Sequence, residues 1–160
     1  YKSYIGIGWA QLYYAGTFLA PDKHYLRDSL REKSKFYFDS ALVFLESSLS
    51  GDILKQDWCN AYSGLSYINY YLGLNDTIYF NNSLSFSDSL LIKKPNYEFY
   101  HDQLNYKNIH YLRGKIFLKK GKYNNACTEI NMATDDTCSC IIDNINMGIL
   151  LDCFDQFAND

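Results

Sequence analysis

Five cysteines and three histidines are the side chains of this 160-residue chain best suited to nucleophilic or metal chemistry. A cysteine nucleophile needs a base within hydrogen-bond reach. No recognisable spacing brings Cys59 or Cys127 next to His24, His101 or His110. We therefore expect no catalytic residue and no cofactor, and we predict that the chain is not an enzyme.

The cysteine spacing also argues against a metal site. Cys138-Ser139-Cys140 has one residue between its cysteines, whereas zinc knuckles and thioredoxin-like sites have two. Cys59, Cys127 and Cys153 fall on apolar helical faces, where a cysteine usually acts as a small buried hydrophobe. We predict no metal. Two alternatives stay open: a sparse zinc site at Cys138 and Cys140 with a histidine, and, in an exported protein, a disulfide involving Cys127, Cys138 or Cys140.

Charge excludes some classes of partner. The formal net charge is −3 and the isoelectric point is about 5.5, so we expect no nucleic-acid partner, which would need a strongly basic face. The main basic run, formed by Lys115, Lys119, Lys120 and Lys122, suits the C-terminal end of a helix dipole. An anion-binding patch is the alternative for these lysines. No segment is apolar for long enough to span a membrane.

Elements that could position a site follow from the hydrophobic periodicity, which is helical over most of the chain. Tyr97, Leu104, Tyr111 and Leu118, for example, follow one another at steps of seven residues. We find no convincing strand pattern and no linker, so residues 1–160 are expected to form a single domain. Helices are predicted near residues 2–16, 23–49, 54–73, 77–93, 97–120, 122–133 and 138–157.

Small residues recur at fixed steps along two of these helices and the turn between them. The stretch reads Gly114-x-x-Phe117-x-x-x-Gly121-x-Tyr123-x-x-Ala126-x-x-x-Ile130-x-x-Ala133. Small side chains at such positions let two backbones approach closely, and a glycine suits the positive φ of a turn. Over Tyr111–Ala133 the pattern resembles a tetratricopeptide repeat (TPR). It departs from that family in one respect, because Asp135-Asp136-Thr137-Cys138 stands where a proline is usual.

Degraded copies of the motif occur upstream, as expected if one hairpin cannot bury its apolar face alone. Ala61-x-x-Gly64-x-x-Tyr67 matches the first-helix half, and Ser83-x-x-x-Ser87-x-x-Leu90, followed by Pro95, matches the second. Gly6-Ile7-Gly8-Trp9 resembles another first helix, and Phe38-x-x-Ala41-Leu42 the end of its partner. Gly8, Gly64 and Gly114 lie 56 and 50 residues apart, further than the roughly 34 residues of the family.

The resemblance implies an all-α fold, a TPR-like α-α superhelix of about three helical hairpins with a C-terminal capping helix over 138–157. A partner-binding role for that last amphipathic helix is the alternative. The glycine–tryptophan opening and tyrosine-rich helices resemble TPR domains of bacterial envelope lipoproteins. We therefore favour the cell envelope, in the periplasm or on the outer membrane, over the cytoplasm. Any membrane contact would be made through a lipid anchor outside this chain.

TPR hairpins are binding scaffolds, so the resemblance implies a non-catalytic protein–protein interaction scaffold, an envelope-associated assembly or accessory subunit that binds a peptide or helix in a concave groove. First helices line that groove, and tyrosine and tryptophan are favoured contact residues. The alternative function is small-molecule or glycan binding in an aromatic pocket. The candidate partner-binding residues are Trp9, Tyr13, Trp58, Tyr62, Asn69, Asn108, Lys115 and Lys119.

Overall fold

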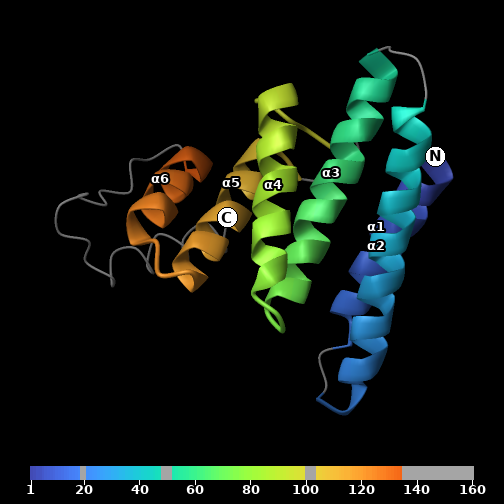
Figure 1. The fold of residues 1–160 in the computed structure, drawn as a ribbon, viewed down its shortest axis with the longest axis horizontal. Coiled ribbons are helices and arrows are strands. Elements are labelled where there is room, and N and C mark those ends of the chain that lie inside the picture. The colour runs from blue at the N-terminus through green and yellow to red at the C-terminus, as the bar shows by residue number, and fades with distance from the viewer. Residues whose placement is uncertain (19–20, 48–51, 100–103, 135–160) are drawn as a thin grey trace. The chain divides into compact units, whose positions relative to one another are not determined.

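The structure, a computed structural model, describes residues 1–18, 21–47, 52–99 and 104–134. These residues form six α-helices and a short 3-10 turn, and they contain no strand beyond one isolated bridge (Figure 1). The predicted all-α class is therefore confirmed for the described part of the chain. The elements are α1 (Lys2–Gly16), η1 (Pro21–Lys23), α2 (His24–Glu46), α3 (Asp52–Gly73), α4 (Ile78–Lys93), α5 (Tyr106–Lys119) and α6 (Tyr123–Ala133).

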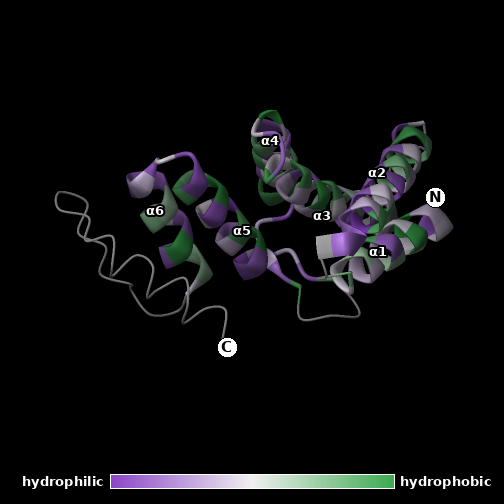
Figure 2. Ribbon diagram, turned by 90° about the horizontal axis from the view of Figure 1, so that it is seen from below, coloured by the Kyte–Doolittle hydropathy of each residue, from purple (hydrophilic) through white to green (hydrophobic). Residues whose placement is uncertain are grey.

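The chain divides into two compact units, Tyr1–Lys94 and Pro95–Asp160. In the first unit, α1 packs against α2 and α3 against α4, while α2 and α3 join the two pairs. In the second unit, α5 packs against α6. Every labelled helix carries both apolar and polar positions (Figure 2), as expected for helices that bury one face and expose the other.

One aromatic ring holds three helices of the first unit together. Phe38 of α2 is fully buried. A Cβ atom placed on Gly64 of α3 would lie 2.2 Å from the Phe38 Cζ atom, and one on Gly8 of α1 would lie 2.9 Å from Cε1. The ring therefore fills the space that two glycines leave open, one on each neighbouring helix. The space beside Gly8 and Gly64 is thus too small for a Cβ atom while the Phe38 ring stays in place, and Gly114 of α5 is buried.

Buried serines take the place of alanine in both hairpins of the first unit. The Ser34 hydroxyl on α2 donates a hydrogen bond of 2.8 Å to the Gly8 carbonyl on α1. The Ser83 hydroxyl on α4 donates one of 2.6 Å to the Ser66 carbonyl on α3. Serine is nearly as small as alanine, and its hydroxyl has a hydrogen-bond partner when it donates to a carbonyl on the facing helix. Serine therefore allows close packing at these positions.

The predicted helix over 97–120 is wrong at residues 97–99 and 104–105, because among the described residues α5 begins at Tyr106. Asn105 has an extended backbone and accepts a hydrogen bond from the Lys107 N–H, while the Asn108 side chain accepts one from the Asn105 N–H at 2.8 Å. This reciprocal cap fixes a helix start. Asn105 also forms the isolated bridge to Glu98. The predicted capping helix over 138–157 lies outside the described residues.

Candidate functional site

Helix α3 presents a pair of stacked aromatic rings beside helix α4. Trp58 and Tyr62 lie four residues apart and therefore on one helical face. Their ring centroids are 3.4 Å apart with an interplanar angle of 22°. Phe86 of α4 meets Tyr62 edge-on, with centroids 5.4 Å apart. All three rings are partly exposed, and we refer to Trp58, Tyr62, Phe86 and Lys93 as the α3 aromatic surface.

Lys93 places a positive charge directly on this surface. Its Nζ atom lies 3.8 Å from the Trp58 ring centroid, within the range of a cation–π interaction. Tyr62 stacks on the same indole at a similar separation, so the two groups must occupy opposite faces to avoid overlap. Both faces of the Trp58 ring are thus covered by neighbours in the free protein.

A further lysine, Lys94, lies near the tryptophan end of this surface. Lys94 donates a hydrogen bond to the Gln56 side-chain oxygen, and the Gln56 amide donates to Asn60 Oδ1 at 2.9 Å. Beneath them lies Cys59, which is fully buried with a free thiol. Burial raises the pKa of Cys59, although the charges of Lys94, Lys93 and Lys55 act in the opposite direction. The Cys59 thiol is therefore protonated and shielded, and it is not poised as a nucleophile.

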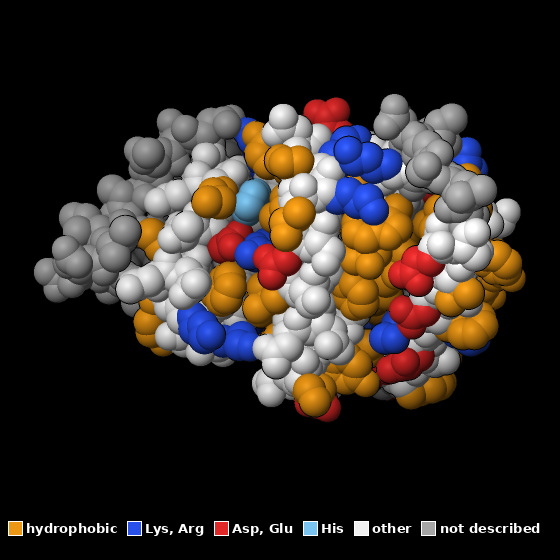
Figure 3. Space-filling view, turned by 45° about the horizontal axis from the view of Figure 1, so that its top comes forward, with side chains coloured by type: hydrophobic (Ala, Val, Ile, Leu, Met, Phe, Trp, Pro, Cys, Tyr) orange, Lys and Arg blue, Asp and Glu red, His pale blue; other side chains and the backbone are white. Residues whose placement is uncertain are grey.

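The other side of the surface is acidic. Burial, with the negative charge of Glu46 at the end of α2 as a smaller cause, raises the pKa of the Tyr62 hydroxyl. Figure 3 shows the same polarity, with blue side chains at one end of an apolar strip and red side chains along the ridge to its right. The α3 aromatic surface thus lies between Lys93 of α4 and Glu46 of α2.

The structure brings two of the eight sequence-predicted residues together at this surface, Trp58 and Tyr62. It places two others in the core. Trp9 is 6% exposed and packs edge-on against Phe38 with centroids 5.5 Å apart. Asn69 is 0% exposed, and its amide donates to the Leu65 carbonyl of its own helix at 2.8 Å. Tyr13, by contrast, is 54% exposed on α1 and lies 5.7 Å from Trp9 between ring centroids.

The remaining three predicted residues belong to α5 in the second unit. Asn108 is part of the reciprocal cap at the start of that helix. Lys115 is half-buried, with its Nζ atom 5.2 Å from the Tyr111 ring centroid. Burial lowers the pKa of Lys115, and the charge of Lys119 lowers it further. Lys119 itself is exposed. These positions do not form a patch comparable to the α3 aromatic surface.

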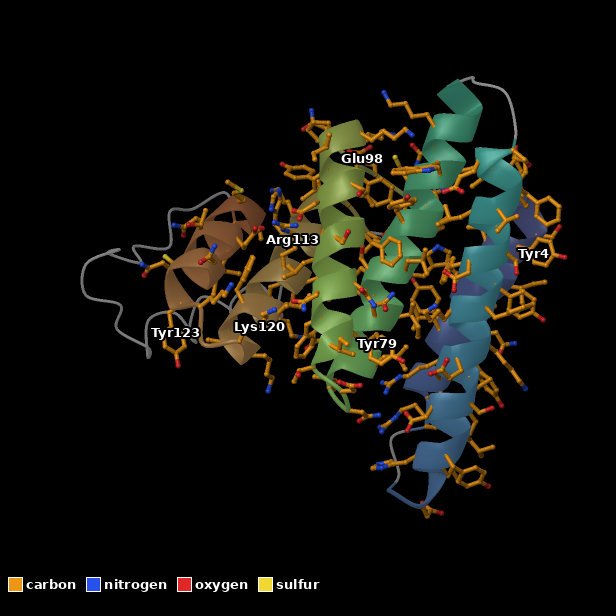
Figure 4. The ribbon with its side chains drawn as sticks, viewed as in Figure 1. Tyr4, Tyr79, Glu98, Arg113, Lys120 and Tyr123 are labelled. Carbon is orange, nitrogen blue, oxygen red and sulfur yellow. The ribbon has the colours of Figure 1, made fainter. Side chains whose placement is uncertain are left out.

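A buried charged cluster joins α5 to α6. His110 Nδ1 lies 2.8 Å from Glu129 Oε2. Arg113, labelled in Figure 4, contacts Glu129 Oε1 through Nε at 2.9 Å and Nη2 at 2.8 Å. Burial alone would raise the pKa of Glu129, but hydrogen bonds from His110 and Arg113 outweigh that cost and hold the pKa below its ordinary value. Both carboxylate oxygens are engaged, which fits a role in packing the hairpin.

Sequence reasoning missed this cluster and the contribution of α4 to the aromatic surface. Phe86 and Lys93 lie seven residues apart, about two helical turns, so their shared face was legible in the sequence. The pairing of Glu129 with α5 was not, because nothing local couples residues 16 to 19 positions apart.

Cys127 is disulfide-bonded, consistent with the disulfide alternative raised for it. Cys138, Cys140 and Cys153 lie outside the described residues. Across the described ranges, no group of three or more histidine, cysteine or acidic side chains is arranged to hold a metal ion. None of the described helices combines the length and apolar character needed to cross a bilayer.

No protein-family model, curated protein or solved structure shows significant similarity to this chain.

Proposed function

We propose that this chain is a non-catalytic protein–protein interaction scaffold that binds a peptide or helix across the α3 aromatic surface. The observation that carries the proposal is the partly exposed Trp58–Tyr62–Phe86 group with Lys93 over its tryptophan. Tyrosine, tryptophan and cationic side chains concentrate binding energy in protein interfaces, because they bury a large area and keep a polar handle.

A TPR-like architecture is part of the proposal. Two features support it: the helices pack as sequential pairs, and glycines on α1 and α3 make the same close approach to Phe38. In an array of this kind the first helix of each pair lines one common face, and α3 is such a helix. The finer assignment to a superhelix with a terminal cap would be tested by an experimental structure of the whole chain.

A binding role is favoured over catalysis by the state of the reactive groups. The Cys59 thiol is buried and Cys127 is disulfide-bonded. The Glu129 carboxylate is held by two partners. Groups that are shielded or fully engaged are poor acids, bases and nucleophiles.

The cell envelope remains our proposed location. The disulfide at Cys127 supports export, because disulfides persist in oxidising compartments such as the periplasm. We also retain the proposal that a lipid anchor outside this chain could tether it there. Cell fractionation, combined with peptide mapping under non-reducing conditions, would test the location and the disulfide together.

Selection from a random peptide library displayed on phage tests the proposed function. Peptides should be enriched on the wild-type protein, and Trp58→Ala should weaken their binding by about 2 kcal/mol or more if Trp58 is a hot spot. Tyr25→Ala is the matched control, because Tyr25 is 70% exposed on α2 and belongs to no part of the surface. Thermal melts of both variants separate lost binding from lost folding.

Two outcomes would contradict the proposal. If Trp58→Ala loses stability in proportion to binding, Trp58 is a core residue and the surface is not the site. If no peptide is enriched but a glycan array gives ligands that depend on Trp58, the alternative of a glycan binder replaces the scaffold. The present geometry disfavours a sugar stacked on Trp58, since Tyr62 and Lys93 already cover both ring faces.

A further inference from the structure

We infer that the partner segment is acidic, and that one of its carboxylates draws Lys93 away from Trp58 so that an apolar partner side chain can take its place. The inference rests on the proposed function and adds to it the chemistry of the partner and the order of contacts at the surface.

Both faces of the Trp58 ring are covered by neighbouring side chains in the free protein. Lys93 lies over one face of the Trp58 ring and Tyr62 stacks on the other. An apolar side chain can reach a face of the indole only if one of them moves. Tyr62 is partly buried and packs against Phe86, whereas Lys93 is an exposed side chain at the end of α4. Lys93 is therefore the group that moves away from the Trp58 ring when a partner binds.

Moving Lys93 away from Trp58 costs free energy, because the cation–π contact is lost. A cation–π contact at an exposed site is weakly favourable. An apolar segment would lose that interaction without replacing it. A carboxylate offers the ammonium group an ion pair instead, so an acidic partner offsets the loss.

Charge is distributed unevenly around the α3 aromatic surface. The Lys93 ammonium group lies over the Trp58 ring, and Lys94 donates a hydrogen bond to Gln56 of the same helix as Trp58, so two ammonium groups lie at the tryptophan end. Glu46 acts on Tyr62 from the α2 side and repels a carboxylate there. Charge complementarity therefore orients the segment, with its acidic residues over the lysines and its apolar residue over the rings.

The test uses the peptide most enriched on the wild-type protein, made synthetically with a fluorescent label. We expect it to contain aspartate or glutamate next to an apolar residue. Lys93→Met, which keeps an unbranched apolar side chain, should weaken its binding about threefold to tenfold, and Lys94→Met should weaken it less, because Lys94 also bonds Gln56. Lys23→Met, at an exposed lysine of η1, should leave affinity unchanged.

Changes in the peptide make the test independent of protein folding. Replacing its acidic residues by asparagine or glutamine should reproduce the loss seen with Lys93→Met, and raising the salt concentration should weaken the wild-type complex. Peptides that bind through Trp58 without acidic residues, or with equal affinity to Lys93→Met, would overturn this inference and leave the proposed function standing. Failure to enrich any peptide would overturn both.

Discussion

Hairpins α3–α4 and α5–α6 use related sequence patterns but hold their helices together by different chemistry. Across α3–α4 the contact is neutral, with the Ser83 hydroxyl on the Ser66 carbonyl. Across α5–α6 the small residue is Ala126, and the polar contact is the charged cluster of His110, Arg113 and Glu129. A shared spacing of small residues therefore fixes how closely two helices approach, while neighbouring residues decide how the contact responds to pH.

The largest effect should come from α2, which packs against α3 of the neutral hairpin. Phe38→Ala should lower the free energy of unfolding by about 3–5 kcal/mol, because the ring fills the space left by two glycines. Chemical denaturation would measure the loss. Phe36→Ala is the control, since Phe36 is 64% exposed on the same helix and should cost less than about 1 kcal/mol. Equal losses would show that Phe38 does not join the helices.

On the charged side, Glu129→Ala should cost about 3 kcal/mol, because it removes a buried carboxylate that is bonded to both His110 and Arg113. Glu32→Ala, at an exposed position on α2, serves as the control and should change little. Denaturation curves at neutral pH would compare the two. A loss no greater than that of the control would mean that the cluster does not stabilise α5–α6.

The Glu129 carboxylate should make the stability of the α5–α6 hairpin sensitive to acid. The pKa of Glu129 is lowered in the folded protein, so its contribution is fully present above the ordinary value of about 4.3 and is lost as the pH falls through the folded pKa. The stability difference between wild type and Glu129→Gln should therefore shrink below about pH 4. A difference that stays constant across that range would rule out the linkage.

Ala126→Leu should overpack the α5–α6 contact and cost about 1–3 kcal/mol, since Ala126 is fully buried. Its neighbour Asn125 is exposed, so Asn125→Leu is a control that adds a leucine to the same helix away from the helix crossing. Thermal melts would distinguish the variants, and indistinguishable melting temperatures would place Ala126 away from the helix crossing.

The smallest expected effect is the loss of a single serine hydroxyl. Ser83→Ala should cost about 1 kcal/mol, because it removes one buried hydrogen bond to α3. Ser89→Ala is the matched control, since the Ser89 hydroxyl bonds only within its own helix. If Ser83→Ala is as stable as wild type, alanine and serine are equivalent at this crossing and the contrast between the hairpins is weaker than described.

The sequence predicted the helices well because their periodicity is local. The first helix, 2–16, has the predicted bounds, and Gly73 and Gly121 lie at the ends of α3 and α5 as expected. The start of α5 was missed because the seven-residue apolar pattern continues through Tyr97 and Leu104, whereas the Asn105 cap begins the helix later. There the apolar pattern predicts that the helix continues, whereas the Asn105 cap predicts that it begins, and the helix begins at the cap.

The candidate site was only partly predictable. Trp58 and Tyr62 could be paired from their spacing, but Trp9 and Asn69 occupy similar helical positions and turn into the core. The reason is packing: α1, which carries Trp9, contacts α2 and α3, and α3, which carries Asn69, contacts α1, α2 and α4. More of the circumference of each helix is therefore covered than a two-helix pattern suggests. Which residues of a first helix stay exposed depends on neighbours far away in sequence.

The contact of Phe38 with both Gly8 and Gly64 also bears on how the first unit opens. A ring shared by α1 and α3 ties their local unfolding together, since neither helix can separate from α2 without exposing the same side chain. Amide hydrogens of α1 and α3 near these glycines should then exchange with solvent as one cooperative group rather than as two independent hairpins.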